Sequence, residues 1–152
     1  MAIRAQYAQR TYAGNLFKNG SVSQLSARYT HVVTPALLLR AEAVVVRTNA
    51  TGARHSGTNT ALSIGGQFAF SGGFVANLDV NLGVDQRNGI HPLFGVTRQD
   101  RRRSVALRLR KRDLRIGNFV PEISVGYTNV KSTLPINSYR NTYMSLQLSR
   151  QF

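Results

Sequence analysis

The chain contains long stretches in which apolar and polar residues alternate one by one. In residues 74–85, every second residue from Phe74 to Val84 is apolar, and most of the residues between them are polar. A period of two separates the two kinds of side chain onto opposite faces of a β-strand, whereas a helix would mix them. This stretch is longer than a typical strand of a soluble sheet, about 5–6 residues. It matches a tilted strand that crosses a bilayer, about 9–11 residues.

The same alternation recurs along the chain and predicts a series of antiparallel strands. The predicted strands are residues 3–12, 21–33, 37–47, 60–70, 74–85, 103–112, 122–130 and 142–152. Short turns are expected at 34–36, 71–73 and near Gly117, and longer polar loops at 13–20, 48–59, 86–102 and 131–141. Tight turns that alternate with long loops are typical of outer-membrane barrels. The pattern predicts an all-β, antiparallel, up-and-down transmembrane β-barrel with about eight strands visible in this chain.

The two tight hairpins predict a strand register. If each turn holds three residues, Arg28 lies opposite Glu42 and Phe68 lies opposite Ala76. Both pairings are favourable, because opposite charges or apolar side chains then meet across the strands. A shift by one residue would mix the faces, so the predicted turns agree with the predicted strands.

Composition narrows the class of protein. The formal net charge is +14, charged residues make up 17%, and the chain has no cysteine. Disulfides, thiolate metal sites and thiol nucleophiles are therefore excluded. A basic chain rich in uncharged polar residues fits either a nucleic-acid binder or a membrane β-barrel.

A transmembrane helix or a secretory signal in the sequence would predict where in the cell the protein is located. No apolar run reaches the roughly 18 residues of a transmembrane helix, and residues 1–7 do not form the apolar segment of a secretory signal. We expect either a cytoplasmic protein or the C-terminal piece of a longer precursor, and the barrel pattern favours the outer membrane. Residues 1–152 would then form one outer-membrane barrel domain or the C-terminal part of a larger barrel.

Charged residues on the polar faces of the predicted strands are candidates for the barrel lumen. They are Arg28, Arg40, Glu42, Asp79, Arg108, Arg110 and Glu122. A narrow lumen must be filled by hydrogen-bonded polar groups, because unpaired charges there are costly. In a wider pore, the excess of positive charge would favour anionic or acidic cargo. On the opposite faces, the residues expected to point outward to lipid are Leu78, Val80, Leu107, Leu146 and Leu148.

The last predicted strand resembles the C-terminal signal that outer-membrane proteins present to the barrel-assembly machinery. It ends at Phe152, preceded on the same face by Met144, Leu146 and Leu148. Arg150 stands where that signal usually has an aromatic or apolar residue. The alternative is the edge strand of a soluble sheet.

A basic run at 101–103, continued by Arg108 and Arg110, suggests a second kind of partner. Arginine pairs well with phosphate, so nucleic acid is one interpretation. The run is interrupted by apolar residues at strand spacing and lacks interleaved aromatics, which argues against a stacking platform. Arginines at a strand end also suit the phosphates of lipopolysaccharide, and no nucleic-acid partner is expected.

Nothing in the sequence has the pattern of a catalytic, cofactor or metal site. His31, His55 and His91 are far apart and lack neighbouring ligands. No nucleophile–base constellation and no glycine-rich phosphate loop is found. We expect no enzyme activity, no cofactor and no bound metal.

Short motifs in the last third of the chain add a family resemblance. They are Arg98 and Asp100 before a hairpin, Gly117, Phe119 and Pro121 at its turn, and Tyr139, Arg140 and Asn141 before the last strand. Their order resembles the tail of the surface lipoprotein assembly modifier family. The chain departs from the pattern at Asn118, an insertion in the turn, and at Thr133, where the family has asparagine.

The resemblance implies an outer-membrane barrel of about fourteen strands, preceded by a periplasmic helical-repeat domain. Its implied role is to help lipoproteins reach the cell surface, with a surface lipoprotein as cargo. One alternative is a small structural, adhesive or porin-like barrel, and another is an Arg-rich soluble β protein that binds nucleic acid. Because residues 3–12 lack a clear apolar face, we expect an incomplete sheet in which they do not pair with residues 142–152.

Overall fold

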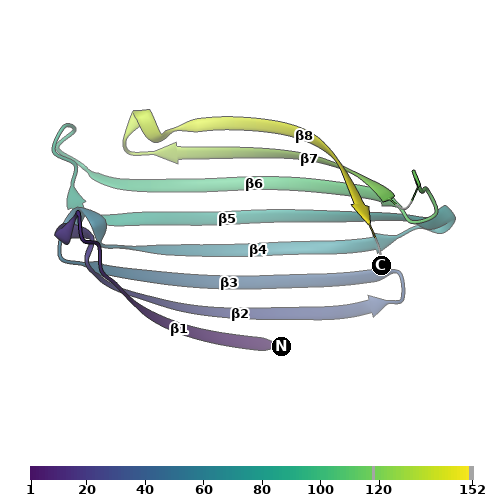
Figure 1. The fold of residues 1–152 in the computed structure, drawn as a ribbon, viewed down its shortest axis with the longest axis horizontal. Coiled ribbons are helices and arrows are strands. Elements are labelled where there is room, and N and C mark those ends of the chain that lie inside the picture. Colours follow the sequence, from purple (N-terminus) through teal and green to yellow (C-terminus); the bar gives the residue numbers. More distant parts are fainter. Residues whose placement is uncertain (118, 151–152) are drawn as a thin grey trace.

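The structure is a computed structural model that describes residues 1–117 and 119–150. It is a single antiparallel sheet in which each strand pairs with the next along the chain (Figure 1). The strands are β1 (Ala2–Arg10), β2 (Gly20–Thr34), β3 (Leu37–Ala50), β4 (Gly57–Ala69), β5 (Phe74–Ile90), β6 (Thr97–Lys111), β7 (Phe119–Ser132) and β8 (Tyr139–Arg150). Short 3-10 turns lie in the connections, namely η1 (Leu16–Lys18), η2 (Ala53–His55), η3 (Ser71–Gly73) and η4 (Pro135–Asn137). Among the described residues, no helix has the length and apolar character needed to span a membrane.

The predicted all-β, antiparallel, up-and-down order is confirmed, and so is the register of both tight hairpins. Arg28 lies opposite Glu42, and Phe68 lies opposite Ala76. The first turn is tighter than predicted, because the register shifts after Val32 and Thr34 pairs with Leu37. The alternation therefore fixed which side chains share a face, although it missed a local bulge.

Strands β2 to β8 extend further towards the long connections than predicted, whereas β1 ends earlier, at Arg10. The expected loop at 86–102 is largely strand, because β5 continues to Ile90 and β6 begins at Thr97. Hydropathy alternation stops where the outward side chains become polar, whereas the backbone ladder continues beyond that point. The long connections still gather at one end of the sheet, whereas β8 ends towards the other and β1 begins about midway along β2, where Ala2 pairs with Arg28 (Figure 1).

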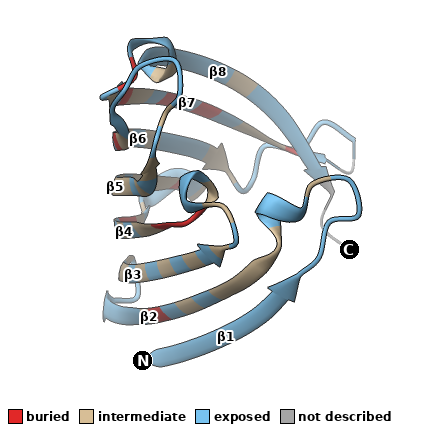
Figure 2. Cartoon of the chain, turned by 90° about the vertical axis from the view of Figure 1, so that its left-hand side faces the viewer, coloured by how far each residue is buried: buried red, intermediate tan, exposed pale blue. Residues whose placement is uncertain are grey.

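The sheet is curved and open. Figure 2 shows β1 and β8 curling towards the same concave side, and the strand order runs from β1 to β8 without returning. The predicted lack of pairing between the first and last strands is confirmed for the described residues, and the eight strands form an open sheet that is not closed into a barrel. β1 pairs with β2 only from Gly20 to Arg28, so it is too short to offer a ladder along the full sheet. Closure needs the first and last strands to pair over their length.

The described residues do not form a packed apolar interior. The buried apolar residues among them are Val75, Val120, Val130 and Leu134. Large apolar side chains are instead exposed on every strand, and Figure 2 shows only short buried stretches along the strands. A sheet in water normally buries one face against another layer, so the apolar face of this sheet requires a different environment.

Candidate functional site

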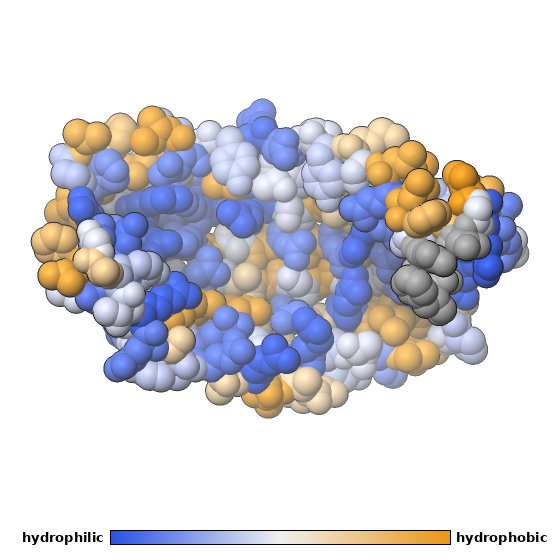
Figure 3. Space-filling model, viewed as in Figure 1, coloured by the Kyte–Doolittle hydropathy of each residue, from blue (hydrophilic) through white to orange (hydrophobic). Residues whose placement is uncertain are grey.

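A polar hollow occupies the concave side of the sheet. Its volume is about 770 Å³. Strands β2 to β8 all contribute to its wall. Figure 3 looks onto this side and shows hydrophilic side chains around the hollowed centre. The lining residues are Arg28, Thr30, Leu38, Arg40, Ala41, Glu42, Ser63, Gly65, Asp79, Asn81, Ala106, Arg108, Glu122, Ser124, Tyr143, Ser145 and Gln147.

The structure brings most of the candidate lumen residues together in this hollow. The members that line it are Arg28, Arg40, Glu42, Asp79, Arg108 and Glu122. Arg110 shares the hollow's face of β6, two residues beyond Arg108, but lies outside the lining. It sits opposite Glu122 in the ladder, and its buried Nε makes no hydrogen bond among the described residues.

Asp79 is the centre of the strongest polar contact in the hollow. Its Oδ1 accepts a hydrogen bond from Arg40 Nη2 at 2.6 Å, and its Oδ2 accepts one from Arg108 Nη2 at 2.7 Å. The Asp79 side chain is 19% exposed, against 38% for Arg40 and 44% for Arg108. One carboxylate therefore joins arginines from β3 and β6, in a charge-assisted geometry that orders the wall.

A glycine on the strand between Arg40 and Asp79 makes this bridge possible. Arg40 on β3 and Asp79 on β5 lie on either side of Gly65 on β4. A Cβ at Gly65 would lie 2.3 Å from Asp79 Oδ1 and 2.9 Å from Arg40 Nε. The glycine is needed because its position must stay empty for two strands to bond across a third.

Smaller contacts complete the polar wall. The Arg28 and Glu42 side chains form an ion pair at 2.7 Å near the β2 margin, where Arg28 is largely exposed. Ser63 Oγ donates to Asn81 Oδ1 at 2.6 Å. The Ser124 and Ser145 hydroxyls lie 2.7 Å apart and share a hydrogen bond. The wall is thus lined by polar groups that largely satisfy one another.

The opposite face of the same strands is apolar and exposed. Leu78, Val80, Leu107, Leu146 and Leu148, predicted to point outward, all remain exposed and none lines the hollow. They belong to the outer face, a surface formed by the residues that alternate with the hollow's lining. The prediction that these residues avoid a packed interior is confirmed, since the described chain forms one sheet layer.

The C-terminal and family-like motifs do not converge on one site. Met144, Leu146 and Leu148 lie in a row on β8, exposed on the outer face, while Phe152 lies outside the described residues. Gly117 has a φ of 63° in the turn before β7. Phe119 lies opposite Arg150 in the β7–β8 ladder, and Pro121 lies opposite Leu148.

The remaining motif residues lie at the other end of the sheet. Arg98 Nε donates to Asp100 Oδ2 at 2.8 Å at the start of β6. Tyr139, Arg140 and Asn141 open β8 and pair with Val130, Asn129 and Thr128. These residues therefore mark the beginnings of strands.

Sequence reasoning missed the smaller members of the hollow. Ser63, Asn81 and Gly65 lie on the polar faces of their strands, but the alternation does not predict their contacts, because these depend on three neighbouring strands. The one available signal was Gly65–Gly66 inside a strand pattern, which often marks a close approach of other groups. In the described part of the chain, no cluster of three His, Cys, Asp or Glu residues could hold a metal ion.

Comparison with known proteins gives one family match. The family model described as surface lipoprotein assembly modifier matches residues 1–152. No curated protein and no solved structure matches the chain significantly. Members of this family are non-enzymatic outer-membrane proteins with a role in surface lipoprotein assembly, which implies interaction with a lipoprotein cargo. With a match over its whole length and an eight-stranded meander typical of barrel proteins, the chain belongs to the surface lipoprotein assembly modifier family.

Proposed function

We propose that this sheet is one wall of a larger outer-membrane β-barrel through which, or along which, a surface lipoprotein passes. The outer face would contact lipid, and the polar hollow would face the lumen. The separation of the two faces carries this proposal: the charged candidates line one hollow, while the large apolar residues are exposed on the other side. In a transmembrane barrel the lipid-facing and lumen-facing residues alternate in this way.

The boundary between apolar and charged residues on the outer face runs obliquely to the strands, which supports a location in the membrane. On β3 the first outward charged residue towards the long connections is Arg47, which pairs with Thr58. On β6 it is Arg103, which is level with Leu82 and, through Leu62, with Ala43. The boundary therefore shifts along the strands from β3 to β6. Strands that cross a flat slab at a tilt produce such a shift.

Charge balance in the hollow indicates how the wall would treat a cargo. The lining contains three arginines, Arg28, Arg40 and Arg108, and three carboxylates, Glu42, Asp79 and Glu122. Because several of these charges bind one another, the wall offers few free charges to hold a passing chain. A wall of this kind favours transit of a polar polypeptide over tight binding.

The open edges support completion by further strands. β1 and β8 each have a neighbour on one side in the described sheet. Their free backbone groups would be costly in a bilayer, where no water can satisfy them. Additional strands would cover both edges, and the apolar row of β8 would be the surface that the barrel-assembly machinery recognises.

Cysteine labelling tests the two faces directly, because the chain has no cysteine of its own. We would place single cysteines at Asn81 and Ser124 in the hollow and at Leu78 and Leu107 on the outer face. In outer membranes, a water-soluble maleimide should label the hollow positions. A bilayer-partitioning maleimide should label the outer positions.

The matched pair Asn81 and Val80 is the sharpest control, because the two residues are neighbours on β5 and point to opposite faces. Equal labelling of both cysteines by the water-soluble reagent would contradict the proposal. That result would mean that the outer face is in water.

A further inference from the structure

We propose that the outer face carries a binding site for the phosphates of lipopolysaccharide, at the end of the sheet that holds the long connections. The site is a group of exposed cations on β6, β7 and β8, here called the rim cluster. Its members are Arg101, Arg103, Lys131 and Arg140. The inference rests on the proposed barrel, in which the long connections point out of the cell.

Strand pairing brings the rim cluster together. Arg101 lies directly opposite Lys131 in the β6–β7 ladder. Arg103 and Arg140 both pair with Asn129, from its two sides. Arg101 and Arg103 are two residues apart on β6, so they share a face. Four cations from three adjacent strands thus occupy one patch.

The protein itself supplies no counter-charge for this patch. The carboxylates of the strands, Glu42, Asp79, Asp85, Asp100 and Glu122, all occupy positions that alternate with outward ones. Among the described residues, no ion pair includes a member of the rim cluster. Like charges directly opposite one another destabilise a sheet, so an external anion would relieve a real cost.

The position of the patch specifies the kind of anion. Val105, two residues beyond Arg103, pairs with Tyr127, and from there the outer face is apolar. A ligand that meets both surfaces must carry phosphate beside acyl chains. Lipid A, the membrane anchor of lipopolysaccharide, has two phosphates on an acylated sugar, and arginine binds phosphate through paired hydrogen bonds.

The same residues argue against a nucleic-acid site. Arg102 lies between Arg101 and Arg103 but points to the concave side, as do Arg108 and Arg110. The basic run is therefore divided between two faces and forms no continuous groove. Stacking platforms for nucleic acid need aromatic side chains among the cations.

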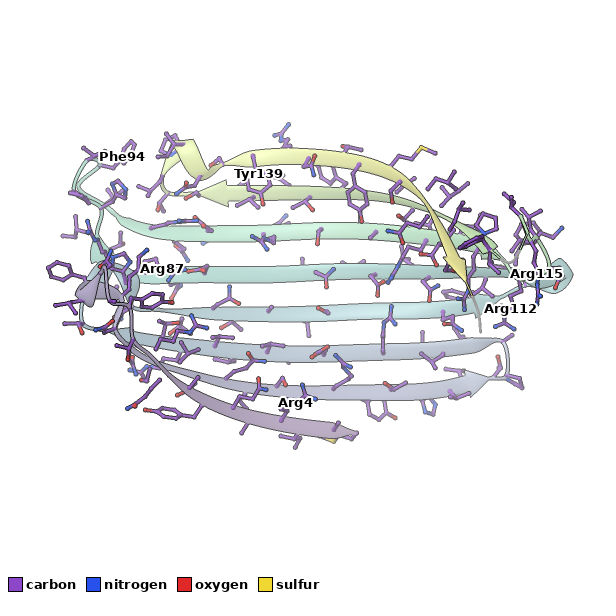
Figure 4. All side chains as sticks on the ribbon, viewed as in Figure 1. Arg4, Arg87, Phe94, Arg112, Arg115 and Tyr139 are labelled. Carbon is purple, nitrogen blue, oxygen red and sulfur yellow. The ribbon has the colours of Figure 1, made fainter. Side chains whose placement is uncertain are left out.

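The test is a titration of the full chain in mild detergent with diphosphoryl lipid A, with bound lipid counted by native mass spectrometry. The double substitution Arg101→Gln/Arg103→Gln should weaken binding about tenfold, as expected when charge-assisted contacts are lost. The control Arg4→Gln/Arg102→Gln removes the same charge from the concave side and should bind like the unaltered chain. Arg4 is labelled on β1 in Figure 4.

Two further arms make the outcome decisive. Arg101→Lys/Arg103→Lys keeps the charge but loses the paired hydrogen bonds, so its binding should lie between that of the unaltered chain and that of the glutamine double. Phosphatidylglycerol should bind more weakly than lipid A. Equal binding of the two lipids, or equal loss in both glutamine doubles, would overturn the proposal. The titration does not depend on barrel orientation, so failed cysteine labelling of the hollow would overturn the proposed function separately.

Discussion

Neighbouring residues of β5 lie on opposite faces of the sheet, in polar and apolar surroundings. Asp79 points into the hollow, where two arginines bind it and its side chain is 19% exposed. Leu78 and Val80 point the other way and are 42% and 40% exposed. The charged side chain is thus more enclosed than the apolar ones. This difference is what the proposed lipid contact of the outer face predicts.

In a bilayer, the free-energy costs of exposing apolar and charged side chains are the reverse of those in water. In water, exposed large apolar side chains on all eight strands would form an unusually large patch, since monomers rarely expose more than a few hundred Å². In a bilayer the same patch costs nothing to leave uncovered by protein, whereas an unpaired charge there is costly. The two faces therefore respond oppositely to the same substitution.

A charge placed on the outer face should produce the largest effect. Leu107→Arg at the middle of β6 should lower the free energy of unfolding in lipid vesicles by about 2–4 kcal/mol. Gln147→Arg is the matched control, because it lines the hollow and pairs with Glu122. The free energy of unfolding of this control, measured by guanidinium titration in lipid vesicles, should change little. Equal costs at the two positions would erase the difference between the faces.

Loss of the Asp79 bridge should have a smaller effect. Asp79→Asn leaves Arg40 and Arg108 without their shared carboxylate, and should cost about 1–2 kcal/mol after allowance for their partial exposure. Gly65→Ala should break the Arg40 half of the same bridge by steric conflict.

The two substitutions can be combined in a double-mutant cycle. Because both act on one bridge, the double variant should cost less than the sum of the single variants, as measured by the same titration. Strict additivity would show that Gly65 does not serve the bridge. Ser124→Ala, elsewhere in the hollow, should add independently to either one.

The smallest expected effect is on the connection that contains His55. Burial of the imidazole, with further contributions from Arg54, Lys18 and Arg87, lowers the pKa of His55 below its usual value. Between the usual pKa, about 6.5, and the lowered one, the unfolded connection takes up a proton that the folded one does not. Order in η2 should therefore weaken as the pH falls below about 6.5.

Hydrogen exchange at the Ser56 amide, which bonds the Ala53 carbonyl, would report this change. His55→Gln should remove the pH dependence, while His91→Gln, in the connection between β5 and β6, should leave it intact. A Ser56 amide whose protection does not vary with pH would contradict the prediction. The change should stay local, because neither His55 nor the three cations that lower its pKa line the polar hollow.

Much of the site could be predicted from alternation, because alternation is a local property. The period of two on β5 assigns Asp79 to one face and Leu78 to the other without knowledge of the neighbouring strands. The opposition of Arg28 and Glu42 also followed from a nearby turn. The true ends of β5 and β6 did not follow, because polar residues can continue a ladder when both faces are wet.

The sequence by itself determined the face of each strand residue, the antiparallel order and the two tight turns near 34–36 and 71–73, since these depend on neighbours along the chain, but the connection between Lys111 and Phe119 is longer than the short turn it predicts. The tertiary structure decided the bridge from Arg40 across Gly65 to Asp79, because it needs three strands in register and an empty position between them. It also decided that the sheet stays open. Closure depends on whether β1 and β8 can meet over their length, and the curvature of the whole sheet, together with the short β1, sets that distance.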